Sequence, residues 1–310
     1  MRGRRVAALV LLAAAFAAAA VLTYLLFVQT AAGQWLDNAM LGGRLSNSPD
    51  AIDDSLDVLS AVSVSRLALV GLVVVVIAAV QRRFVLAVGA VVMILAANVT
   101  TQVLKHWILE RPQLMGVTDP FGYRNSLPSG HATLFMSLAL ALVLVTPPRY
   151  RGLVAILAGA YALYSGTATI TVGWHRPSDV VTAYLVAGFW TALAAAVVVL
   201  WRGFDVDAAT WGVEGWRWPV SAAALLGALG AAGVVISIVG IGVTGVMLVG
   251  GGRNIRSGDF GWAYTTGRLA SVGLGLLVLA GILYTLRRLR LEQGRRRRLP
   301  FVTPVARRRD

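Results

Sequence analysis

The chain has 310 residues, of which 57% are hydrophobic and only 14% are charged. A soluble domain carries about a quarter charged residues, and the apolar residues here form long blocks, which excludes an ordinary soluble protein. The formal net charge is +14, and arginines are concentrated in residues 287–310. Because this basic run follows a membrane helix, we expect it to bind anionic lipid rather than nucleic acid. Cysteine is absent, which excludes disulfides and thiolate metal sites.

Eight apolar stretches are each close to the roughly 20 residues that cross ~30 Å of hydrocarbon. They are residues 6–28, 60–81, 84–104, 130–146, 152–171, 180–201, 219–247 and 266–286. The first follows a basic cluster, as in a signal peptide, but its apolar run is longer than that of a cleaved signal, so we expect a retained anchor. The pattern predicts an all-α membrane protein, with a six-helix transmembrane bundle and two additional C-terminal transmembrane helices.

Arginines flank these spans unevenly, and their distribution predicts the orientation. With the N-terminus in the cytoplasm, the arginines after the second, fourth and sixth spans and the arginine-rich tail all lie inside. The outer loops are then 29–59, 105–129, 172–179 and 248–265. Because the number of spans is even, both termini are expected in the cytoplasm. We divide the chain into four parts. These parts are an N-terminal helix with an acidic outer loop (1–59), a catalytic core (60–201), two extra helices with an outer glycine- and arginine-containing loop (202–286), and the tail (287–310).

Three polar motifs lie next to helix ends in the outer loops. They are Lys105-x6-Arg111-Pro112 after the third span, Pro128-Ser129-Gly130-His131 at the start of the fourth, and His175-Arg176-Pro177-Ser178-Asp179 at the start of the sixth. The stretch from His131 to His175 is long enough for one crossing inward and one crossing back. Both histidines are therefore expected at the same face of the membrane.

Both histidine motifs have the features of a helix start. Their prolines suit the first helical turn, where free N–H groups and the positive end of the helix dipole attract anions. Ser129 and Gly130 allow backbone amides to approach a ligand closely. Together with the cations Lys105 and Arg111, these amides predict a phosphate-binding site.

The same residues suggest a chemical mechanism for phosphoryl transfer. His175 can act as the nucleophile, because Asp179 lies one helical turn later and can orient its ring. His131 is then available to protonate the leaving alkoxide and to activate the hydrolytic water. This chemistry requires no metal or other cofactor.

The three ordered motifs resemble those of the type 2 phosphatidic acid phosphatase (PAP2) superfamily over roughly residues 60–201. The resemblance implies a PAP2-like bundle and a magnesium-independent phosphomonoester or diphosphate hydrolase. It also implies that His175 and Asp179 form the nucleophilic pair. Lys105, Arg111, Ser129, Gly130 and His131 would bind phosphate or assist the leaving group.

The third motif departs from the family pattern Ser-Arg-x5-His-x3-Asp, because Ala168 and Thr169 occupy the Ser-Arg positions. A phosphate-binding guanidinium is therefore missing, and a hydroxyl cannot reproduce its fork of donors. Three outcomes remain open: another arginine substitutes, the substrate is unusual and its phosphate is held differently, or activity is weak or lost. Thr169 is one possible auxiliary contact. The candidate arginines on the same face are Arg124, Arg176, Arg253 and Arg256. The last two lie in a loop that is either a connector or a cover over the site.

The expected function is hydrolysis of a lipid phosphate or polyprenyl (di)phosphate at the outer face of a bacterial plasma membrane, through a phosphohistidine intermediate. One alternative is phosphotransfer to a lipid or sugar hydroxyl. The other is a non-catalytic lipid-binding or transport module. The expected partners are the lipid substrate and membrane lipids, without nucleic acid, and the sequence does not define the oligomeric state.

Overall fold

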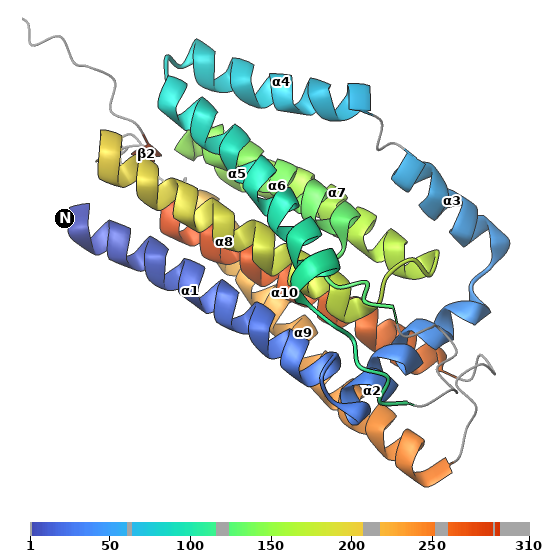
Figure 1. Ribbon diagram of the computed structural model, residues 1–310. Coiled ribbons are helices and arrows are strands. Elements are labelled where there is room, and N and C mark those ends of the chain that lie inside the picture. The colour runs from blue at the N-terminus through green and yellow to red at the C-terminus, as the bar shows by residue number, and fades with distance from the viewer. Residues whose placement is uncertain are drawn as a thin grey trace, which may run out of the picture.

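The computed structural model describes residues 2–60, 64–115, 124–206, 218–251, 260–287 and 289–291. Its long helices run side by side in one bundle (Figure 1). In chain order the elements are α1 (Arg2–Phe27), α2 (Ala31–Gly42), η1 (Gly43–Ser46), α3 (Pro49–Ser60), α4 (Val64–Val80), α5 (Phe84–Val103), η2 (Leu104–Ile108), α6 (Gly130–Val145), η4 (Pro148–Tyr150), α7 (Arg151–Thr171), α8 (Pro177–Arg202), β1 (Phe204–Val206), α9 (Trp218–Gly251), α10 (Gly261–Leu286) and β2 (Leu289–Leu291).

The predicted all-α membrane fold is confirmed, and the chain is a multi-pass membrane protein. Each of the eight predicted spans coincides with a helix, namely α1 and α4 to α10. Within the described residues, six helices are long and apolar enough to cross a membrane, whereas α4 and α6 contain shorter apolar segments. The 16 residues of α6 rise about 24 Å, less than the ~30 Å of a hydrocarbon core, because the helix begins at Gly130 and ends at Val145.

The segment expected to be an acidic outer loop contains α2, η1 and α3, which the apolar pattern did not predict. Thr30 caps α2, and its hydroxyl accepts a hydrogen bond of 3.0 Å from the amide of Gly33. Gly33 also allows α2 to fold back on the end of α1, since a Cβ there would lie 1.8 Å from the carbonyl oxygen of Leu26. As a result, α2 packs against α8 and α10 at one end of the bundle (Figure 1).

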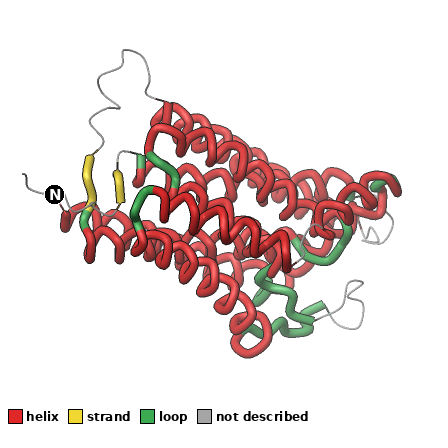
Figure 2. Tube along the Cα trace, turned by 90° about the horizontal axis from the view of Figure 1, so that it is seen from above, coloured by secondary structure: helices red, strands yellow, loops and turns green. Residues whose placement is uncertain are grey.

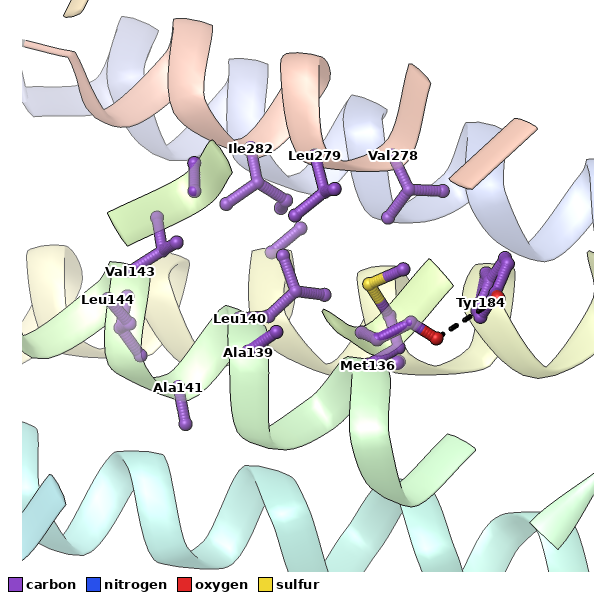
Figure 3. Close-up of a cluster of buried hydrophobic side chains, with 14 of the residues drawn as sticks. Met136, Ala139, Leu140, Ala141, Val143, Leu144, Tyr184, Val278, Leu279 and Ile282 are labelled. Atoms are coloured by element: carbon purple, nitrogen blue, oxygen red, sulfur yellow. Dashed lines mark hydrogen bonds between the residues drawn. The ribbon is translucent and has the colours of Figure 1, made fainter. Parts of the chain in front are cut away.

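Helix α8 is the centre of the bundle and packs against α1, α5, α6 and α10. Figure 3 shows side chains of α6, α8 and α10 meeting in a continuous apolar core. Tyr184 of α8 is fully buried there, and its hydroxyl donates to the carbonyl of Ala162 at 3.3 Å. Gly166 of α7 makes room for it, because a Cβ at this position would lie 1.9 Å from the Tyr184 hydroxyl. Small residues thus allow close approach of the helices, as is usual in membrane bundles.

The two short strands lie at the end of the bundle that contains the N-terminus (Figure 2). β1 and β2 pair antiparallel and join the end of α8 to the end of α10. Beneath them, the fully buried Arg151 donates to the carbonyls of Val143, Leu286 and Leu289. These bonds, with the packing of α10 on α7 and α8, make the two additional helices part of the same bundle.

Candidate active site

Lys105 lies where α5 widens into the π-helical turn η2. Such turns are frequent at functional sites, because they redirect side chains at the end of a helix. Asn125 holds this turn against the segment that precedes α6, donating to the carbonyls of Lys105 at 3.1 Å and Leu109 at 2.9 Å. The chain before His131 is thereby fixed beside the half-buried Lys105.

Ser129 begins α6 and connects it to α8. Its hydroxyl caps α6 by accepting from the amide of Ala132 at 3.3 Å, and its own amide donates to the carbonyl of Asp179 at 3.0 Å. The Ser129 amide is therefore occupied within the protein. The amides of Gly130 and His131, in the first turn of α6, remain the backbone donors that this helix start can offer an anion.

His175 lies just before α8 and contacts the first turn of that helix. Its Nδ1 is 3.1 Å from Oδ2 of Asp179, which also accepts from the amide of Arg176 at 2.9 Å. Both His175 and Asp179 are buried, with relative exposures of 8% and 1%. The carboxylate can hold Nδ1 as the protonated nitrogen, which leaves Nε2 with the lone pair that a nucleophile needs.

The motif residues come together at one end of the bundle. His131 lies within electrostatic range of both His175 and Lys105, and Lys105 within range of Asp179. The ring of His131 also lies 5.3 Å from the ring of Trp174, the residue before His175. Two imidazoles and an ammonium group therefore surround one region between the starts of α6 and α8.

Helix α2 adds a buried polar layer behind this region. Asp37 accepts from the Ser178 hydroxyl at 2.6 Å and from the Ser178 amide at 3.2 Å. The neighbouring Asn38 accepts from Nε of Arg176 at 2.6 Å. Burial, reinforced by the charge of Asp179, raises the pKa of the Asp37 carboxyl to about 6. The first turn of α8, which carries Asp179, is thus held from the α2 side.

The residues considered as phosphate contacts occupy different environments. Arg111 is 8% exposed and lies within electrostatic range of Asp37. Arg176 is 4% exposed and also donates to the Ser126 hydroxyl at 3.2 Å, so its guanidinium is already hydrogen-bonded within the protein. Thr169 is fully buried, and its hydroxyl donates to the carbonyl of Gly166 at 2.7 Å.

Of the remaining auxiliary candidates, only Arg124 lies among the described residues. Arg124 is exposed. Arg253 and Arg256 lie outside the residues that the structure describes. Across the described ranges, no group of three His, Cys, Asp or Glu side chains is arranged to hold a metal ion.

The contribution of α2 was missed by the sequence reasoning. The buried Gln34, Asp37 and Asn38 are spaced at i, i+3 and i+4, which places them on one face of a helix. An acidic outer loop was expected over this segment, and its carboxylates Asp50, Asp53, Asp54 and Asp57 are exposed, whereas Asp37 is buried. The spacing of the three polar residues is the signal that distinguishes them.

Comparison with known proteins gives one family match. Residues 86–203 match the sequence model of the PAP2 superfamily, a range that extends from α5 to the end of α8 and includes all three motifs. No curated protein and no solved structure gives a significant match.

Proposed function

We propose that this chain, whose residues 86–203 match the model of the PAP2 superfamily, hydrolyses a lipid phosphate or polyprenyl (di)phosphate through a phosphohistidine at His175. The observation that carries the proposal is the buried His175–Asp179 pair, with Nδ1 and Oδ2 3.1 Å apart, next to the start of the helix that carries His131. A nucleophile, its orienting carboxylate and a second imidazole are the groups that this chemistry needs.

In the first step, Nε2 of His175 attacks the phosphorus atom and the bond to the leaving oxygen breaks. His131 donates its proton to that oxygen, so the product leaves as an alcohol or as a protonated phosphate. The positive charge that forms on the His175 ring is stabilised by Asp179. The amides at the start of α6 and the cations Lys105 and Arg111 neutralise the phosphoryl oxygens.

In the second step, His131 is neutral and removes a proton from water. The water oxygen attacks phosphorus, the P–N bond breaks, and inorganic phosphate leaves with His175 restored. Transfer to a lipid or sugar hydroxyl would follow the same course, with that hydroxyl in place of water.

A lipid substrate is supported by the position of the site at one end of a membrane bundle. Exposed aromatic side chains flank it, with Trp107 at 84% and Trp174 at 48% relative exposure. Tryptophan side chains favour the membrane interface, where the phosphate of a lipid lies. We place the site at the outer face of a bacterial plasma membrane, because the opposite end carries the arginines of the α4–α5 and α6–α7 connections.

A release assay tests the function directly. Purified protein in detergent is incubated with phosphatidic acid, phosphatidylglycerol phosphate, a polyprenyl diphosphate and a phosphorylated prenyl sugar, and inorganic phosphate is measured. Wild type should release phosphate from at least one of them, His175→Ala should release none, and His106→Ala is the matched control because His106 is an exposed histidine beside Lys105. Label transfer to an added alcohol without release of phosphate would indicate a phosphotransferase, and no turnover of any substrate would favour a non-catalytic module.

A further inference from the structure

Arg44, in the 3-10 turn η1, packs directly on the loop that carries His175. A Cβ at Gly173 would lie 2.3 Å from Cζ and 2.4 Å from Nε of Arg44, so the guanidinium occupies the space that a side chain would take. Gly173 also has a φ of +82°, which favours glycine. Both the backbone conformation and the contact with Arg44 therefore require glycine at position 173, two residues before His175.

The Arg44 guanidinium has an unused donor at this position. Its Nε is buried and has no hydrogen-bond partner among the described residues. Within the ranges that the structure describes, no carboxylate lies within ion-pair distance of Arg44. A buried donor without an acceptor is costly, and a guanidinium fork binds phosphate oxygens particularly well. The residue as a whole is only partly buried.

Thr169 provides a second, independent observation. It stands where the sequence analysis found a guanidinium missing, and its carbonyl accepts from the amides of Trp174 and His175 at 2.9 and 3.2 Å. The last turn of α7, which carries Thr169, is thus bonded to the loop that carries Gly173 and His175. Its hydroxyl, which donates to Gly166, is no substitute for a cation.

We propose that Arg44 binds the phosphoryl oxygens of the substrate and supplies the positive charge that Thr169 lacks. This inference rests on the proposed function and adds a binding residue from outside the matched region 86–203. It also assigns a role to the α2–η1 segment, which brings the cation to the site from the N-terminal part of the chain. Of the arginines considered from sequence, the described ones are less suitable, since Arg176 is bonded to Asn38 and Ser126 and Arg124 is exposed.

Inorganic phosphate is the probe, with its affinity for the full-length protein in detergent measured by isothermal titration calorimetry. Arg44→Met keeps bulk over Gly173 but removes the charge, and Arg44→Lys keeps the charge without the fork. Arg149→Met is the matched control, since Arg149 stacks on Tyr150 at the opposite end of the bundle. We expect the dissociation constant to rise about 10- to 100-fold in Arg44→Met, the range for one hydrogen bond to a charged group. It should rise less in Arg44→Lys and stay unchanged in Arg149→Met.

A contact that only packs on the loop gives a different result. In that case Arg44→Met, with an unchanged unfolding temperature, binds phosphate within about twofold of wild type, which overturns the inference. If Arg44→Met does not fold, Arg44→Lys decides, and wild-type phosphate affinity in that variant also overturns it. Phosphate binding without hydrolysis of any lipid would refute the proposed function and leave Arg44 as a phosphate ligand. Hydrolysis of a lipid phosphate with undiminished phosphate affinity in both variants would support the proposed function and refute the role of Arg44 as a phosphate ligand.

Discussion

The amide of Ser129 donates a 3.0 Å hydrogen bond to the carbonyl of Asp179. This bond joins the start of α6 to the first turn of α8, so the helix that carries His131 is fixed to the carboxylate that orients His175. Residues 50 positions apart in the chain are thereby held together by a bond between backbone atoms. The same bond explains why changes near Asp179 should affect both histidines.

Replacing Asp179 with Asn should lower kcat by about 10²- to 10⁴-fold, as in triads where the orienting carboxylate is neutralised. Asn keeps the size of the side chain and an acceptor for the Arg176 amide, but it can donate to Nδ1 and so favour the wrong tautomer. The unfolding temperature should change much less than the rate. Steady-state kinetics with the best lipid phosphate measure the effect, and a decrease of less than about tenfold would show that the carboxylate is not essential.

Asp37 should make stability depend on pH. Its folded-state pKa of about 6 is above its ordinary value of 3.8, so the folded protein holds this proton more tightly than the unfolded chain. Stability should therefore fall as pH rises from about 4 to about 6 and then level off, by up to about 3 kcal/mol. Asp37→Asn should remove this component.

Thermal unfolding in detergent at several pH values measures the effect of Asp37. Asp53→Asn is the control, because it removes an exposed carboxylate of α3. If the stability of wild type and that of Asp37→Asn change with pH in the same way across this interval, the assignment is contradicted.

Gly166 should tolerate no larger residue. An alanine Cβ would meet the Tyr184 hydroxyl at 1.9 Å, and overpacking of this kind costs about 1–3 kcal/mol. Gly227→Ala is the matched control, since a Cβ there meets only Ala280 at 3.7 Å. Unfolding temperatures of the two variants in the same detergent should differ clearly. Equal values would mean that α7 and α8 do not pack as described.

The orientation can be tested with single cysteines, because the chain contains none of its own. Cysteine at position 50 or 149 introduces one exposed thiol at each end of the bundle. In intact bacterial cells, a membrane-impermeant maleimide should label the Asp50→Cys protein, and the Arg149→Cys protein only after permeabilisation. The opposite labelling pattern would place the site on the cytoplasmic face.

Much of the fold follows from local sequence properties. Each transmembrane helix satisfies its own backbone hydrogen bonds, so length and apolar composition are sufficient to predict helices at all eight positions, six of which are long and apolar enough to cross a membrane. Helices α2 and α3 lack this signal, because they are short and mixed in polarity. Helix α2 is held by tertiary contacts, in which Ser178 donates to Asp37 and Arg176 donates to Asn38.

The site was predictable to a similar degree. Topology alone brings His131 and His175 to one end of the bundle, and the i, i+4 spacing brings Asp179 to His175. The roles assigned to these residues remain predictions. Arg44 could not be found from sequence, since its approach to Gly173 depends on how α2 folds back at Gly33.

The central claim is a covalent phosphoryl group on His175. The most direct measurement is rapid acid-free quenching of the protein with a ³²P-labelled lipid phosphate, followed by peptide mapping. The account predicts an acid-labile, base-stable label on the peptide that contains His175 in wild type and in His106→Ala, and none in His175→Ala. A label on another residue, or phosphate release by His175→Ala at the wild-type rate, would contradict it.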